Sequence, residues 1–282
     1  MVLESLLNPT IAKKKPWDVF AFGMFAASIG LFLSYWIFRE YSSLIMVFLI
    51  TLSAVPLFYF TVTSEEQYDL SLVGEPAILK EHSRVLFFLM TLFVGITVAL
   101  SIWYIILPAS MTNVLFASQS QTIVDINNHI SGNFFSVDIL AKIFLNNFRV
   151  LVFSILFAFL YGVGSLFILT WNAAVIAVAI GNFVRINLAA AADVVGFHSV
   201  GVYLGVFSLG LLRYFIHGIP EILAYFVGGL AGGIISVAII KHDLFSDRRE
   251  KILFDAAELV LIAVGLLVIA AVLEVTVTPL LF

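Results

Sequence analysis

The chain of 282 residues contains no cysteine, and only 11% of its residues are Asp, Glu, Lys or Arg. The absence of cysteine excludes disulfide bonds, thiolate metal sites, iron–sulfur clusters and cysteine nucleophiles. Soluble domains carry about 25% charged residues, so this chain lacks the side chains of an ordinary water-exposed surface. The formal net charge is −4. A chain with so little basic charge is not expected to bind nucleic acid, because phosphate contacts need Lys and Arg in excess.

Apolar residues, in contrast, make up 62% of the chain, and the mean hydropathy is +1.12. A soluble fold of this size could not bury so much apolar surface, because its interior is limited by surface-to-volume scaling. The long runs are apolar on all sides and lack the alternation of a β-barrel. The sequence therefore predicts an all-α protein, a polytopic helical transmembrane bundle whose main contact is the lipid bilayer.

The length of each apolar run predicts how often the chain crosses. A bilayer core of about 30 Å needs about 20 apolar residues in a helix. Residues 171–184 would cover only about 21 Å as a helix and are predicted to be a short or re-entrant element. A broken helix is predicted near 217–221. Seven other runs meet or nearly meet the requirement: 17–38, 44–62, 85–107, 148–169, 200–216, 222–240 and 256–273.

Lysine and arginine are concentrated in alternate loops, which predicts the orientation through the positive-inside rule. They occur before the first run, in the loop 63–84 and in the loop 241–251, whereas the segment 108–141 has neither. We therefore expect a multi-pass protein of the cell membrane with a cytoplasmic amino terminus and with 108–141 and the carboxyl terminus outside. The first run is too long for a cleaved signal peptide and is predicted to be the first membrane helix.

Polar residues at membrane depth are the main candidates for a functional site. In a helix, Arg213, His217 and Glu221 follow one another at four-residue intervals and share a face. A carboxylate at this depth costs at least about 2.5 kcal/mol, and the intervening Gly218 and Pro220 indicate a kink. This intramembrane polar site fits a structural network, a proton- or cation-linked site or, least favoured, direct chemistry. Two potential ligands do not make a zinc site, and no metal, cofactor or catalytic residue is predicted.

A second polar cluster, Asn146, Asn147 and Arg149, stands at the predicted start of the fourth run. Asn172 stands at the start of the short element. Helix capping or hydrogen bonding between helices is the favoured role of these asparagines. Arg149 and Arg185 are expected either to extend to the membrane interface or to pair with the buried carboxylate.

Four glycines of the run 222–240 form two overlapping Gly-x-x-x-Gly spacings, Gly228 with Gly232 and Gly229 with Gly233. Small residues at this spacing let helix backbones approach closely. Packing within the chain is the favoured interpretation, and a homodimer seam is the alternative.

These polar and small residues together resemble the stage II sporulation protein M family of multi-pass membrane proteins. The resemblance rests above all on His217-Gly218-x-x-Glu221 running into a small-residue helix. Asn146-Asn147, Gly162 with Gly164, and Trp171-Asn172 add to it. It is strong between about 146 and 240, so 85–282 is predicted to be a family-like transmembrane core with its outside loop at 108–141. Residues 1–84 are predicted to be a two-span addition with a cytoplasmic loop.

The resemblance implies a membrane scaffold that works with partner proteins. The favoured function is a non-enzymatic scaffold that organises membrane or extracellular protein partners or remodels the membrane. The alternative is a channel or an ion- or proton-coupled transporter that uses His217 and Glu221, since broken helices with ionisable residues form transporter sites. An intramembrane enzyme is least favoured, because neither a Gly-x-Ser-x-Gly motif nor a two-histidine zinc motif is present.

Overall fold

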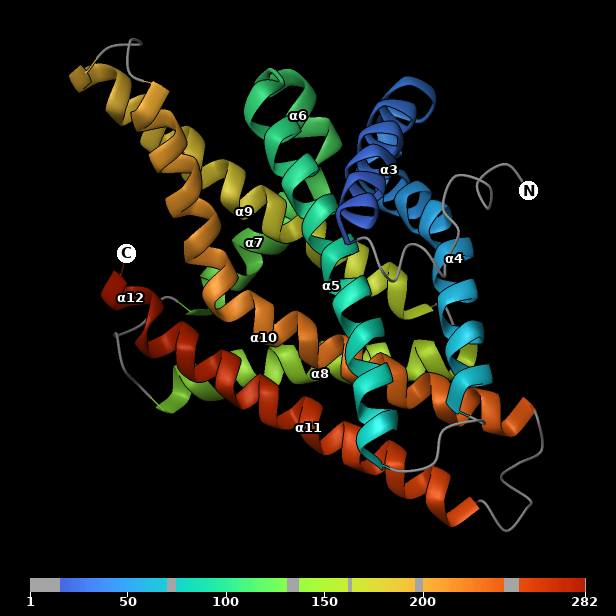
Figure 1. Ribbon diagram of the computed structural model, residues 1–282. Coiled ribbons are helices and arrows are strands. Elements are labelled where there is room, and N and C mark those ends of the chain that lie inside the picture. The colour runs from blue at the N-terminus through green and yellow to red at the C-terminus, as the bar shows by residue number, and fades with distance from the viewer. Residues whose placement is uncertain are drawn as a thin grey trace.

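The computed structural model describes residues 16–69, 75–130, 137–161, 164–195, 200–240 and 249–281. The regular elements within these ranges are helices, which Figure 1 labels. They are α3 (Pro16–Ile37), the 3-10 turn η1 (Arg39–Tyr41), α4 (Ser42–Asp69), α5 (Glu75–Ile106), α6 (Ala109–Leu115), α7 (Ala117–Ile130), α8 (Val137–Tyr161), α9 (Gly164–Val195), α10 (Val200–Ile240), α11 (Arg249–Thr276) and α12 (Thr278–Leu281).

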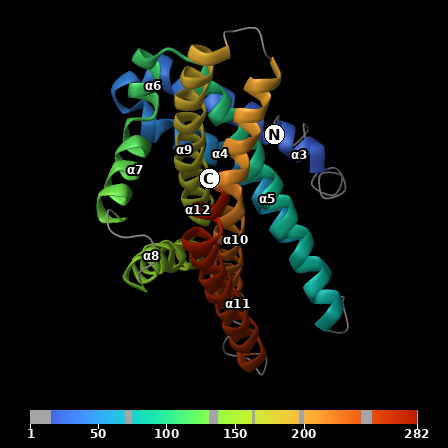
Figure 2. The ribbon, with the colours of Figure 1, turned by 90° about the vertical axis from the view of Figure 1, so that its left-hand side faces the viewer.

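Seven helices in the described part of the chain are long and apolar enough to cross a membrane. They are α3, α4, α5, α8, α9, α10 and α11. The shorter α6 and α7 connect α5 to α8, and α7 packs against α9 (Figure 2). The all-α bundle of about seven spans predicted from composition is confirmed.

Residues 171–184, predicted to form a short or re-entrant element, are part of a full span in the structure. These residues lie inside α9, whose apolar span Leu166–Leu188 has 23 residues, long enough to cross rather than re-enter. The preceding helix, α8, already ends at Tyr161. The polar residues after 169 do not stop α9, because Thr170 and Asn172 donate to the carbonyl oxygens of Leu166 and Ile168, each at 2.8 Å. Their hydrogen bonds are satisfied within the helix, so no break is needed.

The second difference concerns the helix break expected near 217–221. The runs 200–216 and 222–240 form one helix, α10, which passes through Pro220 without interruption. Figure 1 shows that α10 bends near its middle. A proline removes one backbone hydrogen bond and crowds the preceding turn, which bends a helix without ending it. Two predicted runs thus become the single span α10, and the predicted short element becomes part of the span α9. The total therefore stays at seven spans.

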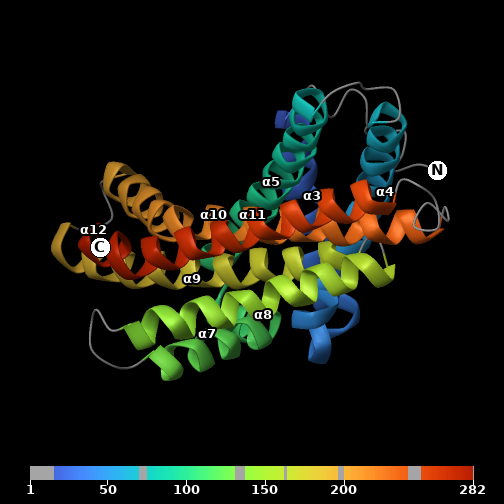
Figure 3. The same cartoon turned by 90° about the horizontal axis from the view of Figure 1, so that it is seen from below.

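The helices share one hydrophobic core. α10 packs along α11 and α8, and α3 packs along α5; Figure 3 shows α8, α10 and α11 running side by side. Buried side chains from both the first two spans and the later ones belong to a single contiguous cluster. The predicted division between 84 and 85 falls inside α5. Many large apolar side chains remain exposed, including Phe25 on α3 and Leu261 on α11, as expected for helices in contact with lipid.

Candidate functional site

The intramembrane polar site lies where α10 runs beside α11 and α12. His217 Nδ1 of α10 is 3.2 Å from Thr278 Oγ1, the first residue of α12. Helices α10 and α11 run in opposite directions (Figure 3). The α10 residue one turn after His217 therefore lies opposite the residue one turn before Thr278, near the end of α11. This register brings Glu221 beside Glu274, and the two carboxyl groups lie within electrostatic range of each other.

Tyr225 closes the site one turn further along α10. Its side chain is fully buried, and its hydroxyl donates a 2.7 Å hydrogen bond to Glu221 Oε1. Glu274 also lies within electrostatic range of this hydroxyl. We refer to His217, Glu221, Tyr225, Glu274 and Thr278 as the α10–α11 polar site. The three α10 residues are spaced by four positions, and Glu274 at the end of α11 and Thr278 in α12 have the same spacing.

The predicted third member of the stripe, Arg213, points toward a different helix. Its guanidinium lies over the ring of Phe183 in α9, 5.3 Å from the centroid, and 5.9 Å from the centroid of Tyr214. Tyr214 in turn contacts the His217 ring edge to face. Arg213 thus lies on the α9 side of the α10–α11 polar site, and Tyr214 contacts both Arg213 and His217.

Gly218 is buried on the side of α10 that faces α9, but the space around it would also admit a larger residue. A Cβ added at this position would lie 3.6 Å from Ile176 Cδ1, which is ordinary van der Waals contact. The bend of α10 is therefore attributed to Pro220, and the structure gives no packing reason for a glycine at 218.

The glycines further along α10 lie on α8 instead. A Cβ at Gly232 would collide with the backbone carbonyl oxygen of Ile155, and one at Gly228 with the Leu151 side chain. Gly233 has no heavy atom within 4 Å of such a Cβ, and Gly229 is buried. The Gly228/Gly232 spacing thus lines a close contact between two helices of the same chain.

The asparagine cluster of α8 is placed differently from the expectation. The helix begins at Val137, so Asn146 and Asn147 lie in its third turn and cannot cap its start. Asn146 Nδ2 donates to Asn147 Oδ1 at 3.3 Å; Asn147 is buried, whereas Asn146 and Arg149 are exposed. Asn172 is held within α9 by its bond to Ile168. The structure therefore does not bring these residues to the α10–α11 polar site.

Arg185 forms a second polar centre, at the junction of α9 with the end of α5. Its guanidinium donates to the carbonyl oxygens of Leu107 and Ile105, and its Nη1 lies 3.5 Å from Thr112 Oγ1. It also lies over the Tyr104 ring, 5.0 Å from the centroid. Carbonyl groups at a helix end lack intrahelical partners, and a cation there is stabilised by the helix dipole. Arg185 thus binds backbone carbonyl groups at a helix end, and not the buried carboxylate that was one of its two expected partners.

Sequence reasoning missed Tyr225, Glu274 and Thr278. A signal was present: Glu274 follows the apolar run 256–273, and its four-residue spacing to Thr278 mirrors that of His217 and Glu221. Recognising it would have required knowing that the last span lies antiparallel to the helix that carries Glu221. In the described part of the chain, no group of three or more His, Asp or Glu side chains is arranged to hold a metal ion.

A bundle of seven apolar helices, each long enough to cross a bilayer, defines a multi-pass α-helical membrane protein. The family model described as Stage II sporulation protein M matches residues 19–279. The chain therefore belongs to the stage II sporulation protein M family, and the match includes the first two spans. No curated protein and no solved structure matches the chain.

The carboxyl pair predicts energetic coupling between two residues 53 positions apart. Because the two carboxyl groups lie within electrostatic range of each other, we expect Glu221→Gln and Glu274→Gln to have non-additive effects on the free energy of unfolding, with a coupling of at least about 0.5 kcal/mol. A double-mutant cycle on detergent-purified protein, unfolded with increasing sodium dodecyl sulfate, measures this coupling. The matched control pairs Glu221→Gln with Glu258→Gln on α11, and additivity is expected there. Additive effects in both cycles would show that Glu221 and Glu274 do not interact.

Proposed function

We propose that the chain is a non-enzymatic scaffold of the cell membrane, which organises protein partners or remodels the membrane. The observation that carries the proposal is that polar side chains at membrane depth have partners within the bundle. His217 of α10 contacts Thr278 of α12, Tyr225 donates to Glu221 within α10, and Glu274 of α11 lies within electrostatic range of Glu221. Such pairing satisfies polar groups in a bilayer, where an unsatisfied group costs several kcal/mol. It supports a role in holding helices together, as a rigid scaffold requires.

The α6–α7 segment provides an ordered platform at the amino-terminal end of α4. Gln119 Nε2 donates to the carbonyl oxygen of Ser43 at 3.0 Å, and Ser43 Oγ lies 2.8 Å from Ser118 Oγ. Ser42 Oγ donates to the carbonyl oxygen of Val114. These contacts fix the segment to the start of α4. A fixed polar platform supports contact with protein partners better than a loose connector would.

We further propose that this platform faces outward. In Figure 1 the carboxyl ends of α4, α8 and α10 lie toward the right, with the amino ends of α9 and α11. The carboxyl ends of α9 and α11 and the amino ends of α8 and α10 lie toward the left. With the Lys- and Arg-rich loop 241–251 in the cytoplasm, three spans (α10, α9 and α8) separate it from the α6–α7 segment and one span (α11) separates it from the carboxyl terminus, so both lie outside.

The absence of cysteine gives this orientation a direct test, because single cysteines can be introduced without background. In intact cells we expect a membrane-impermeant maleimide to label Ala117→Cys, on the exposed face of α7, and not Arg249→Cys at the start of α11. Permeabilised cells should show labelling of both. Labelling of Arg249→Cys alone in intact cells would reverse the orientation.

The scaffold proposal is tested by site-specific photo-crosslinking in native membranes. A photoreactive residue at Ala117, exposed on the platform, is expected to give discrete protein adducts. The matched control carries it at Ile269, which is exposed on α11 within the lipid-facing span. Purified chain in liposomes is expected to give no proton or cation flux. No adduct at 117, together with a flux that is lost in Glu221→Gln, would overturn the scaffold in favour of a transporter.

A further inference from the structure

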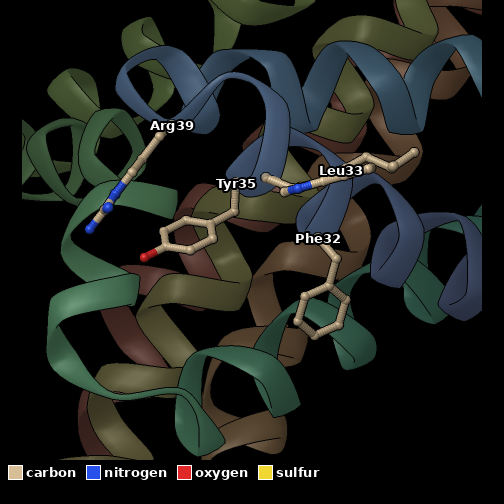
Figure 4. A pocket seen from close by; sticks show the side chains of 5 residues that line it. Phe32, Leu33, Tyr35 and Arg39 are labelled. Atoms are coloured by element: carbon tan, nitrogen blue, oxygen red, sulfur yellow. The ribbon is translucent and has the colours of Figure 1, made fainter.

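A surface cavity of about 500 Å³ lies at the end of α3, away from the α10–α11 polar site. Figure 4 shows it with the side chains that line it. Aromatic and aliphatic groups form most of its wall, and one lining residue carries a charge. The lining residues are Phe32, Leu33, Tyr35, Trp36 and Arg39.

Arg39 supplies the charge of this cavity from η1, the turn between α3 and α4. Its guanidinium lies over the Tyr35 ring, 5.3 Å from the centroid, and the two side chains extend from neighbouring parts of the backbone in Figure 4. A guanidinium stacked in this way keeps its five N–H donors in its own plane, available to a planar or tetrahedral anion. Glu40, the next residue, is exposed and places a negative charge nearby.

The position of the cavity along the span indicates which anion would fit. The apolar span Pro16–Ile37 ends beside it, so Arg39 lies at headgroup level and Phe32 lies about two turns deeper. Trp36 is 80% exposed and Phe32 is 41% exposed. Exposed Trp at a span end is typical of the interfacial aromatic belt. The cavity thus extends from a cation at the interface to bare apolar side chains at hydrocarbon depth.

We propose that this cavity binds an anionic phospholipid, with its phosphate on Arg39 and its headgroup beside Trp36. One acyl chain lies along Phe32 and Leu33. The apolar wall favours a lipid over a free phosphate ion, because a phosphate ion has no apolar groups to contact it. A net negative headgroup suits Arg39 better than a zwitterionic one, whose cationic group is repelled by the guanidinium. The proposal is independent of the scaffold function.

Native mass spectrometry of the full chain in detergent tests this site, with phosphatidylglycerol and phosphatidylcholine as probes. The first phosphatidylglycerol is expected to bind more tightly than the first phosphatidylcholine. Arg39→Gln should weaken it about fivefold, the effect of one basic residue at an anionic membrane surface. Glu40→Gln should tighten it by removing a like charge. The matched control is Arg249→Gln, an exposed arginine in the first turn of α11, which should leave the affinity unchanged.

Three outcomes would overturn the proposal. Equal affinity for the two lipids would mean that the headgroup charge is not recognised. Equal weakening by Arg39→Gln and Arg249→Gln would indicate general attraction to the surface rather than a site. Displacement of phosphatidylglycerol by millimolar inorganic phosphate would indicate an anion site without a lipid.

Because Arg39 and Trp36 are exposed, Arg39→Gln and Trp36→Ala are expected to leave the fold intact, which circular dichroism checks. Trp36→Ala should weaken both lipids, since it removes part of the wall.

Discussion

Gly232→Ala is expected to destabilise the chain by about 1–3 kcal/mol, the usual cost of forcing extra atoms into a packed contact. The added Cβ would meet the backbone carbonyl oxygen of Ile155, which cannot rotate away as a side chain end could. Either α8 and α10 must separate or the backbone must shift. Unfolding of the detergent-purified protein, followed by circular dichroism, measures the loss.

The adjacent residue provides the control for this prediction. Gly233 has open space where its Cβ would be, so Gly233→Ala should be neutral or should stabilise the helix by up to about 1 kcal/mol through propensity alone. The two variants have the same composition and lie one residue apart. Equal effects on stability would show that the α8–α10 contact does not depend on a glycine at 232.

Arg185→Leu is expected to cost about 2–4 kcal/mol and to be the most damaging single change at the α5–α9 junction. The substitution keeps the apolar stem but removes the donors that reach Leu107 and Ile105, which leaves carbonyl groups of the α5 end unpaired. It also removes the cation above the Tyr104 ring. The free energy of unfolding in detergent is again the measurement.

Two comparisons separate this effect from a general loss of charge. Arg185→Lys should retain part of the stability, because an ammonium keeps the charge but lacks the planar fork of donors. Arg149→Leu, at an exposed position of α8, should change stability by less than about 0.5 kcal/mol. If the two leucine variants behaved alike, the carbonyl contacts of Arg185 would contribute nothing.

The helical class and the number of spans follow from length and hydropathy, because a bilayer imposes a minimum apolar length on every crossing. The boundaries follow less well where polar residues interrupt a run. Thr170 and Asn172 read as a helix boundary in the sequence, yet each bonds to a carbonyl one turn earlier and the helix continues. Pro220 reads as a break, yet a proline needs only a bend. Hydrogen bonds within the helix explain why α9 continues through Thr170 and Asn172, whereas α10 accommodates Pro220 by bending.

The candidate site was half predictable. The α10 side of it, His217 and Glu221, could be located because ionisable residues are rare inside apolar runs. The α11 side, Glu274, lies at the edge of an apolar run, where a carboxylate is unremarkable in a sequence. Only the antiparallel register of α10 and α11 gives it a role. Tyr225 was missed as well, although it follows Glu221 by four residues, the same spacing that places His217 on this face of the helix.

The length of α10 has a consequence for the surrounding lipid. Its apolar span Leu204–Ser236 has 33 residues, about 50 Å of helix at 1.5 Å per residue, against a hydrocarbon thickness of about 30 Å. A helix so much longer than the bilayer must lean, bend or thicken the membrane around it, and each response costs a fraction of a kcal/mol per Å of mismatch. The bend of α10 shortens its length along the membrane normal. The apolar length that still exceeds the hydrocarbon thickness must be accommodated by the surrounding lipid. Membranes with longer acyl chains should therefore accommodate the protein at lower cost, so that it concentrates where the bilayer is thickest.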